Sequence, residues 1–149
     1  MKIRLIAVGD KPRSWVSEGF QEYARRLPSQ TPLELVEIPA GKGRPRADQG
    51  QRLLKALRAD DWVVALDEGG STCDTQALAD KLADWRMEGR DIAMLVGGAD
   101  GLPAACLERA DETLSLSKLT FPHELVRVIV AEQIYRAWTI LAGHPYHRV

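Results

Sequence analysis

Segments with the apolar pattern of strands alternate along this chain with segments whose apolar residues recur at helical spacing. This alternation favours a largely parallel α/β sheet covered by helices on both faces. The expected strands are 2–9, 33–38, 62–66, 91–96 and 113–116. The expected helices begin at Pro12 and then cover 47–59, 75–88, 103–108 and 123–141, with Gly143 ending the last one.

Two of these elements lead to more specific expectations. The first helix is predicted to carry one apolar face, made of Trp15, Val16, Phe20, Tyr23 and Leu27. The strand at 62–66 is predicted to end in a turn over residues 67–74, because carboxylates and glycines follow it directly.

Length and composition suit one domain over residues 1–149, since 45% of the 149 residues are hydrophobic. Arg4 and Asp10 interrupt the opening segment before a signal-peptide core forms. No apolar run reaches the roughly 18 residues of a membrane span, so we expect a cytoplasmic protein with no membrane partner. Cys73 and Cys106 lack metal-ligand spacing, and no metal is expected.

The charge balance bears on nucleic-acid binding. A net charge of −1 gives no global attraction to RNA, so any RNA contact must use local patches. The basic segment 42–46 is one candidate, although an ordinary solvated loop explains it equally well. The basic residues near the C-terminus form the other candidate.

Three loops are candidate ligand sites, because crevices in parallel sheets lie outside the carboxyl ends of the strands. The loop after 62–66 begins with Asp67 and Glu68, and a plain tight turn explains it equally well. The loop after 91–96 has three glycines between 97 and 101, where missing Cβ atoms let a ligand approach the backbone.

The glycine loop and the third loop each allow two interpretations. The glycine loop matches neither the G-x-G-x-x-G dinucleotide motif nor the Gly-Lys-Ser/Thr of a Walker loop, so ligand binding and a plain turn stay open. The third loop, 114–123, exposes backbone that can read the edge of a planar ligand between apolar walls. It can equally cap the last helix, with its apolar residues in the core.

Motifs along nearly the whole chain decide between these interpretations. They are IAVG at 6–9, IPAGK at 38–42, LDE at 66–68, VGGADGL at 96–102, SLS at 115–117 with Thr120, PH at 122–123, LVRV at 125–128, AEQIYRAW at 131–138 and HPYHR at 144–148. In sequence and order they resemble the ribosomal RNA large-subunit methyltransferase H family. Val149 departs from the acidic residue expected at the end, which puts only that side chain in doubt.

The resemblance implies a SPOUT methyltransferase with a C-terminal trefoil knot, a topology that general folding rules treat as exceptional. It implies S-adenosylmethionine as the methyl donor and N3 of a pseudouridine in large-subunit (23S) ribosomal RNA, on the assembled ribosome, as the acceptor. It also implies a homodimer in which one subunit's tail completes the other's site. The donor-binding residues carried over are Leu66, Asp67, Gly97, Gly98, Leu116, Ser117, Lys118, Leu119, Thr120 and Phe121.

Methyl transfer to an imide nitrogen benefits from a base and a cation, because the nitrogen becomes nucleophilic as its proton leaves. His147 is the candidate base, and Arg148 or Arg136 is the candidate for stabilising the developing anion. Proton loss to water would need no protein base, and a tail histidine can equally contact phosphate. Arg136 can also form a simple helix-surface pair with Glu132, four residues earlier.

RNA contacts are assigned to the aromatic and basic side chains of the C-terminal part. Tyr146 is a candidate to stack on a flipped base, and His144 and Arg127 are candidates to contact the RNA. The helix 123–141 has more apolar residues than one core-facing stripe requires, which predicts a homodimer. Two alternatives stay open: another nucleotide-binding α/β enzyme that holds phosphate at 97–101, and a non-catalytic ribosome-binding factor.

Overall fold

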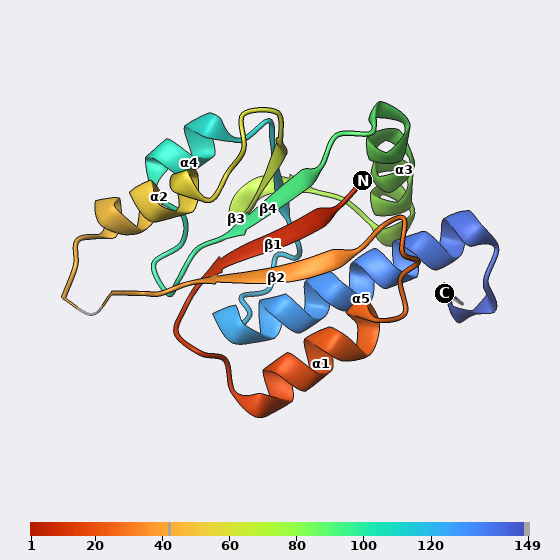
Figure 1. The fold of residues 1–149 in the computed structure, drawn as a ribbon, viewed down its shortest axis with the longest axis horizontal. Coiled ribbons are helices and arrows are strands. Elements are labelled where there is room, and N and C mark those ends of the chain that lie inside the picture. Colours follow the sequence, from red (N-terminus) through yellow and green to blue (C-terminus); the bar gives the residue numbers. More distant parts are fainter. Residues whose placement is uncertain (42, 148–149) are drawn as a thin grey trace.

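A five-stranded parallel sheet forms the centre of the computed structural model, which describes residues 1–41 and 43–147 without the side chains of Arg46 and His147. The strand order is β2-β1-β4-β3-β5, and every neighbouring pair is parallel (Figure 1). The strands are β1 (Ile3–Val8), β2 (Leu33–Ile38), β3 (Trp62–Thr72), β4 (Ile92–Val96) and β5 (Glu112–Ser115). The predicted parallel α/β sheet is confirmed.

Helices cover both faces of this sheet (Figure 1). On one face lie α1 (Ser14–Ala24), α3 (Thr75–Glu88) and α5 (His123–Ala142), and on the other lie α2 (Arg46–Lys55) and α4 (Ala104–Arg109). The short 3-10 helix η1 (Pro145–His147) follows α5. Within the described residues, no helix is both long enough and apolar enough to cross a membrane.

The interior strand β1, between β2 and β4, supplies both cores, because successive side chains of a strand point to opposite faces. Leu5 and Ala7 pack in the core beneath α1, α3 and α5, and Ile6 and Val8 pack in the core beneath α2 and α4. All six residues of β1 are buried. Since both faces of the sheet are covered, ligands can reach it only at the strand ends.

The bounds predicted for α3, residues 75–88, and the end predicted for α5 at Gly143 are both confirmed. Asp74 caps α3 by accepting a hydrogen bond from the backbone N–H of Ala77 at 2.8 Å, and Gly89 ends that helix with φ 73°. Gly143 ends α5 with φ 70°, as predicted. The last helix therefore stops where the tail begins.

The start of α1 corrects two expectations. The helix begins at Ser14 after an extended Arg13, so the prediction that it begins at Pro12 was wrong by two residues. Val16 and Phe20 are buried as expected, but Trp15 is 49% exposed and does not share their core-facing side. The helix buries a narrower stripe than its apolar content suggested.

The end of β3 corrects a third expectation. The strand does not stop at Leu66 but continues to Thr72, pairing with β5 again from Ser71. Residues 67–70 leave the ladder between these two pairings as an outward bulge. The bulge closes because Gly70 lies against the backbone of Thr113 and Leu114, where an added Cβ would come within 2.8 Å. Strand order and register do not test the trefoil knot, which stays a prediction of the resemblance.

Candidate active site

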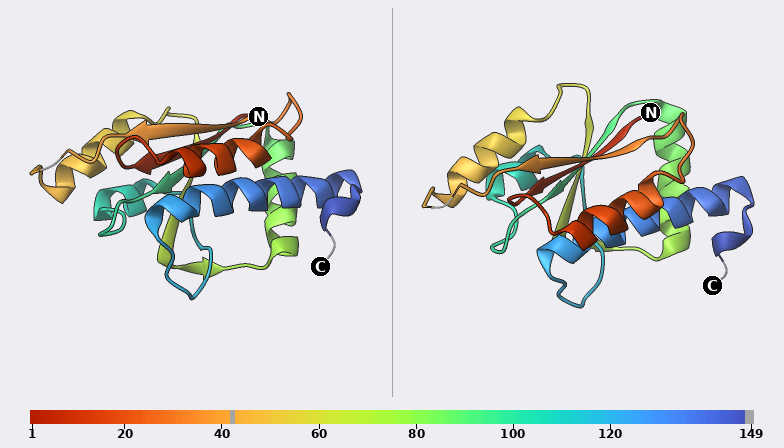
Figure 2. Two further views of the ribbon diagram at one scale, coloured as in Figure 1. Left: turned by 90° about the horizontal axis from the view of Figure 1, so that it is seen from below. Right: turned by 60° about the horizontal axis from the view of Figure 1, so that its bottom comes forward.

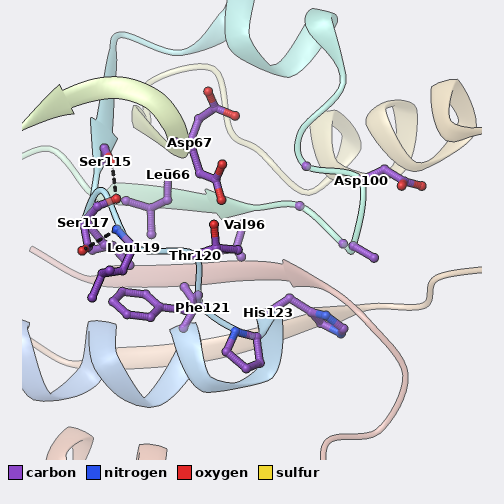
Figure 3. Close-up of a pocket in the computed structure, with 18 residues that line it drawn as sticks. Leu66, Asp67, Val96, Asp100, Ser115, Ser117, Leu119, Thr120, Phe121 and His123 are labelled. Carbon is purple, nitrogen blue, oxygen red and sulfur yellow. Dashed lines mark hydrogen bonds between the residues drawn. The ribbon is translucent and has the colours of Figure 1, made fainter.

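A cavity of about 570 Å³ lies at the carboxyl ends of β3, β4 and β5, where the sequence placed the ligand crevice (Figure 3). All three predicted loops contribute to its wall. Its lining consists of Leu66, Asp67, Glu68, Val96, Gly97, Gly98, Ala99, Asp100, Gly101, Ser115, Leu116, Ser117, Leu119, Thr120, Phe121, Pro122, His123 and Val126. Of the predicted donor-binding residues, only Lys118 lies outside this lining, with its side chain in solvent.

The β3 bulge brings the acidic side chains to the cavity. Asp67 and Glu68 sit in the segment that leaves the ladder, so their side chains face the crevice rather than a neighbouring strand. The carboxylate of Asp67 accepts a hydrogen bond from the backbone N–H of Gly69 at 3.0 Å, which holds the bulge in shape. The interrupted strand thus forms one wall of the cavity.

The two adjacent glycines of the second loop have different roles. A Cβ on Gly97 would overlap the backbone carbonyl of Gly101, so the fold itself requires glycine there. A Cβ on Gly98 would meet only Val8 Cγ1 at 3.6 Å and Gln49 Oε1 at 3.9 Å, which are ordinary contacts. The fold therefore tolerates a Cβ at Gly98, and Gly98 itself lines the cavity.

The third loop is held by its own serines (Figure 3). The hydroxyl of Ser115 donates to the carbonyl of Ser117 at 3.0 Å, and the hydroxyl of Ser117 accepts from the backbone N–H of Leu119 at 2.9 Å. Leu119 is 72% exposed, whereas Phe121 is half-buried against the core side of the loop. The loop is thus shaped before any ligand binds, with apolar side chains along its length.

Several lining residues were missed in the sequence. His123 was expected only to start the last helix, which it does, but it also lines the cavity. Asp100 was visible within the glycine loop and was not assigned a role. Pro122 and Val126 gave no local signal, because only the packing of α5 against the sheet edge brings them there.

The lining of the cavity is acidic. Three of its lining side chains are carboxylates, those of Asp67, Glu68 and Asp100, and none of the lining residues in the described chain is lysine or arginine. Phosphate-binding sites need cations or clustered backbone N–H groups. An acidic wall instead favours a ligand with positive charge.

Arg127 does not lie at the surface where an RNA contact would need it. Its side chain is 1% exposed and forms a two-bond ion pair with Glu37, with Nε–Oε1 3.2 Å and Nη2–Oε2 3.0 Å. The same guanidinium donates to the carbonyl oxygens of His123 at 3.2 Å and Val8 at 3.4 Å. It therefore ties the first turn of α5 to the ends of β1 and β2.

Arg136 lies at the other end of α5 in a cluster with Glu132 and Tyr146. Its Nε lies 2.7 Å from Glu132 Oε1, and this hydrogen bond raises the pKa of Arg136. The guanidinium carbon lies 5.0 Å from the centre of the Tyr146 ring, and burial raises the pKa of the Tyr146 phenol. The helix-surface pair with Glu132 that the sequence left open is thus present.

The other tail residues vary in how far the structure describes them. His144 is exposed, and its Nδ1 accepts from the backbone N–H of Tyr146 at 3.1 Å. The backbone of His147 belongs to η1, but its side chain lies outside the described part of the chain, as does the whole of Arg148. Their predicted catalytic roles stay predictions.

The tail and the cavity are far apart within one chain. The cavity contacts the first turn of α5 through His123 and Val126, and the tail begins after Ala142. At 1.5 Å per residue, about 24 Å of α5 separates Val126 from Ala142, and Tyr146 folds back over Arg136, about 15 Å along the helix from Val126. Figure 2 shows the last described residues, in dark blue after α5, at the far end of that helix in both views. Within the described residues, the tail does not line the cavity of its own chain.

Comparison with known proteins gives matches over the whole chain. The family model described as "Predicted SPOUT methyltransferase" matches residues 1–147. Proteins named "Ribosomal RNA large subunit methyltransferase H" from Methylococcus capsulatus and Alkalilimnicola ehrlichii are each 56% identical over 99% of this chain, covering 100% and 99% of their own lengths. A protein of the same name from Thioalkalivibrio sulfidiphilus is 54% identical over 99% of each chain.

Proposed function

This chain belongs to the SPOUT methyltransferase family, and we propose that it transfers a methyl group from S-adenosylmethionine to large-subunit ribosomal RNA. The finer assignment, N3 of a pseudouridine in 23S RNA on the assembled ribosome in the cytoplasm, rests on the resemblance of the motifs. The observation that supports a donor site in this chain is the acidic, glycine-lined cavity at the sheet edge.

S-adenosylmethionine fits this cavity in size, shape and charge. A volume of about 570 Å³ lies within the range of small-molecule sites, roughly 300–1,000 Å³. Leu116 and Phe121 offer apolar walls for a flat adenine ring, and Gly97 and Gly98 in the lining let a ligand lie against the backbone. Asp67, Glu68 and Asp100 offer negative charge to a donor whose sulfonium and amino groups are positive. The same carboxylates would repel the phosphates of a nucleoside triphosphate. This argues against the alternative in which the cavity binds phosphate.

The donor supplies the activated methyl group, so the protein's task is to bind, align and keep water out. In the transfer, the methyl–sulfur bond breaks as the methyl–nitrogen bond forms, and the acceptor N3 loses its proton. We assign His147 to receive that proton or position it, and Arg148 with Arg136 to stabilise the charge left on the flanking carbonyl oxygens.

We infer that the tail comes from a second chain if it acts at this cavity, because its described part packs over Arg136, about 15 Å along α5 from the cavity residue Val126. Three apolar side chains of α5, Leu125, Val128 and Ile129, are only half-buried and belong to neither core cluster. They form apolar surface along the helix that a partner can cover. We propose a symmetric homodimer in which each cavity receives the tail of the other chain.

Calorimetric titration and RNA mass spectrometry test this function. We expect S-adenosylmethionine to bind and ATP to give no heat of binding at the same concentrations. Large-subunit RNA from a strain lacking this chain should miss one methyl group, which the wild-type chain restores. Unmethylated RNA after complementation, together with normal ribosome binding, would instead indicate a non-catalytic ribosome-binding factor.

A further inference from the structure

The carboxyl edge of the sheet is divided by charge. The acidic cavity occupies the side formed by β4, β3 and β5, whereas the loops that follow β1 and β2 form the other side (Figure 1). In the sequence these two loops, residues 9–13 and 39–46, contain five lysines and arginines and one carboxylate, although the whole chain has a net charge of −1. A local excess of positive charge therefore lies beside the cavity.

Three described side chains carry this charge into solvent. They are those of Lys11, Arg13 and Arg44, which we call the basic shelf. The side chains of Arg13 and Arg44 are 76% and 60% exposed, and Lys11 is exposed too. Lys42 and the side chain of Arg46 lie outside the described part of the chain and are not included in the shelf. The shelf thus consists of three cations that an anion from solution can reach.

Arg13 stands next to the wall of the cavity that α5 forms. Its Nε lies 3.9 Å from Glu124 Oε2, and Glu124 directly follows the lining residue His123. The loop that carries Arg13 starts beside the end of β2, because the backbone N–H of Gly9 donates to the carbonyl of Ile38 at 2.9 Å. The two basic loops therefore leave the sheet side by side.

The loop that carries Arg44 is held beside the glycine loop of the cavity. A Cβ on Gly98 would lie 3.9 Å from Gln49 Oε1, and the Gln49 amide donates to the carbonyl of Ala40 at 3.3 Å. The guanidinium of Arg52 donates to the same carbonyl at 3.1 Å. These hydrogen bonds from α2 fix the start of the loop, and Arg44 is exposed four residues further along.

The carboxylates near the shelf hold its arginines only weakly. The Arg13 pair with Glu124 is 3.9 Å long, and Arg44 Nη1 lies 3.4 Å from Asp48 Oδ2. Exposed pairs of this kind add little to stability, because water and salt screen them. A phosphate accepts stronger charge-assisted hydrogen bonds from a guanidinium than such long pairs provide. Both arginines can therefore exchange a carboxylate for a phosphate.

We propose that the basic shelf binds the phosphates of ribosomal RNA that flank the nucleotide entering the cavity. This inference rests on the proposed function and names the surface of this chain that positions its substrate. Enzymes that act on a base take it out of its stack, and backbone contacts hold the neighbouring nucleotides in register. The carboxylates of the cavity cannot do this, because they repel phosphate. The shelf supplies affinity and position, and the contacts to the base itself select the nucleotide.

The salt dependence of binding to unmethylated large ribosomal subunits tests the shelf. Each lost phosphate contact makes the plot of log affinity against log salt concentration shallower by about 0.7–0.9. The triple variant Lys11→Gln, Arg13→Gln, Arg44→Gln should therefore lose about two units of slope. It should bind subunits about thirtyfold more weakly at physiological salt, roughly threefold for each contact.

A control set removes the same charges at the opposite edge of the sheet. Lys55→Gln, Arg58→Gln and Arg86→Gln remove one exposed lysine and two exposed arginines from segments that precede β3 and β4. Combined in one chain, they should leave the slope and the affinity unchanged. Replacing both shelf arginines by lysine keeps their charge and should also preserve the slope, because lysine binds phosphate as a point charge.

Methyl transfer distinguishes a lost RNA contact from a damaged cavity. The triple variant should keep kcat at saturating subunits with a raised KM, and its S-adenosylmethionine affinity should stay within about twofold of wild type. A wild-type slope in the triple variant, or an equal loss in the control set, overturns the shelf. So does a triple variant that binds bare ribosomal RNA normally and loses only assembled subunits, because its partner is then a ribosomal protein. A wild-type chain that binds subunits through the shelf without methylating them contradicts the proposed function alone.

Discussion

Substitution at Gly98 separates what the fold needs from what the donor needs. The backbone at Gly98 has room for a Cβ, with Val8 Cγ1 at 3.6 Å as the nearest atom. Gly98→Ala and Gly98→Asp should therefore change the free energy of unfolding by less than about 1 kcal/mol. Gly97→Ala should cost about 1–3 kcal/mol, because its Cβ overlaps the backbone of Gly101.

The Gly98 substitutions, which should barely change the free energy of unfolding, are the ones that should weaken donor binding. Gly98 lines the cavity, and the proposed donor lies against its backbone, so we expect roughly tenfold weaker binding for alanine and at least a hundredfold for aspartate. A hundredfold loss corresponds to about 2.7 kcal/mol, the scale of a few lost contacts and a displaced ligand. Asparagine has the size of aspartate without its charge. Gly98→Asn should therefore bind the donor as weakly as Gly98→Asp if the loss of affinity is steric.

Calorimetry with S-adenosylmethionine measures these affinities, and thermal unfolding confirms that each variant is folded. Wild-type affinity in a folded Gly98→Asp protein would remove this loop from the donor site. Weak binding by Gly98→Asp with normal binding by Gly98→Asn would show that charge, not space, is decisive. Either result would contradict the reasoning from the glycine geometry.

Three further substitutions have specific expected outcomes. Asp61→Asn should lower the free energy of unfolding by about 3–5 kcal/mol in chemical denaturation, because it leaves the buried Arg4 guanidinium without its charged partner. Arg127→Lys should destabilise the fold by about 1–3 kcal/mol, since lysine cannot form the two-bond pair with Glu37, yet leave the salt dependence of RNA binding unchanged. Arg148→Ala should abolish methyl transfer while donor affinity stays within about twofold of wild type. A flatter salt dependence of RNA binding in this variant would show that Arg148 contacts phosphate. Normal turnover would contradict any role for Arg148.

The sheet and the location of the cavity could be predicted because their signals are local or general. Strands β1 and β4 and the first part of β3 are short, mostly apolar runs, and the rule that ligands bind at the carboxyl ends of parallel strands led directly to the three loops. The continuation of β3 could not be predicted, since residues 67–70 have the composition of a turn. Only the close approach of Gly70 to the backbone of β5 reveals that the strand resumes.

Arg127 and Trp15 show a different limit of the sequence. The Arg127 partner, Glu37, lies 90 residues away, and nothing near either residue indicates the pairing. A cation between apolar residues of a helix is more often exposed, which favoured an RNA contact. Trp15 follows the apolar pattern of α1, but whether a position at the edge of an apolar stripe is buried depends on how the helix is rotated against its neighbours.

The opposite charges of donor and RNA explain why the proposed site is divided between two chains. Carboxylates that attract a cationic donor repel the phosphates of the acceptor, so one surface cannot favour both. Repulsion from Asp67, Glu68 and Asp100 is screened over about 10 Å at physiological salt, so cations must come close to the cavity to counter it. The described lining offers no lysine or arginine, and the described part of the tail packs over Arg136, about 15 Å along α5 from Val126. In the proposed dimer, a tail from the partner chain would supply positive charge beside the cavity without placing it in the donor's wall, and methyl transfer from a cationic donor to a polyanion needs both charges close together.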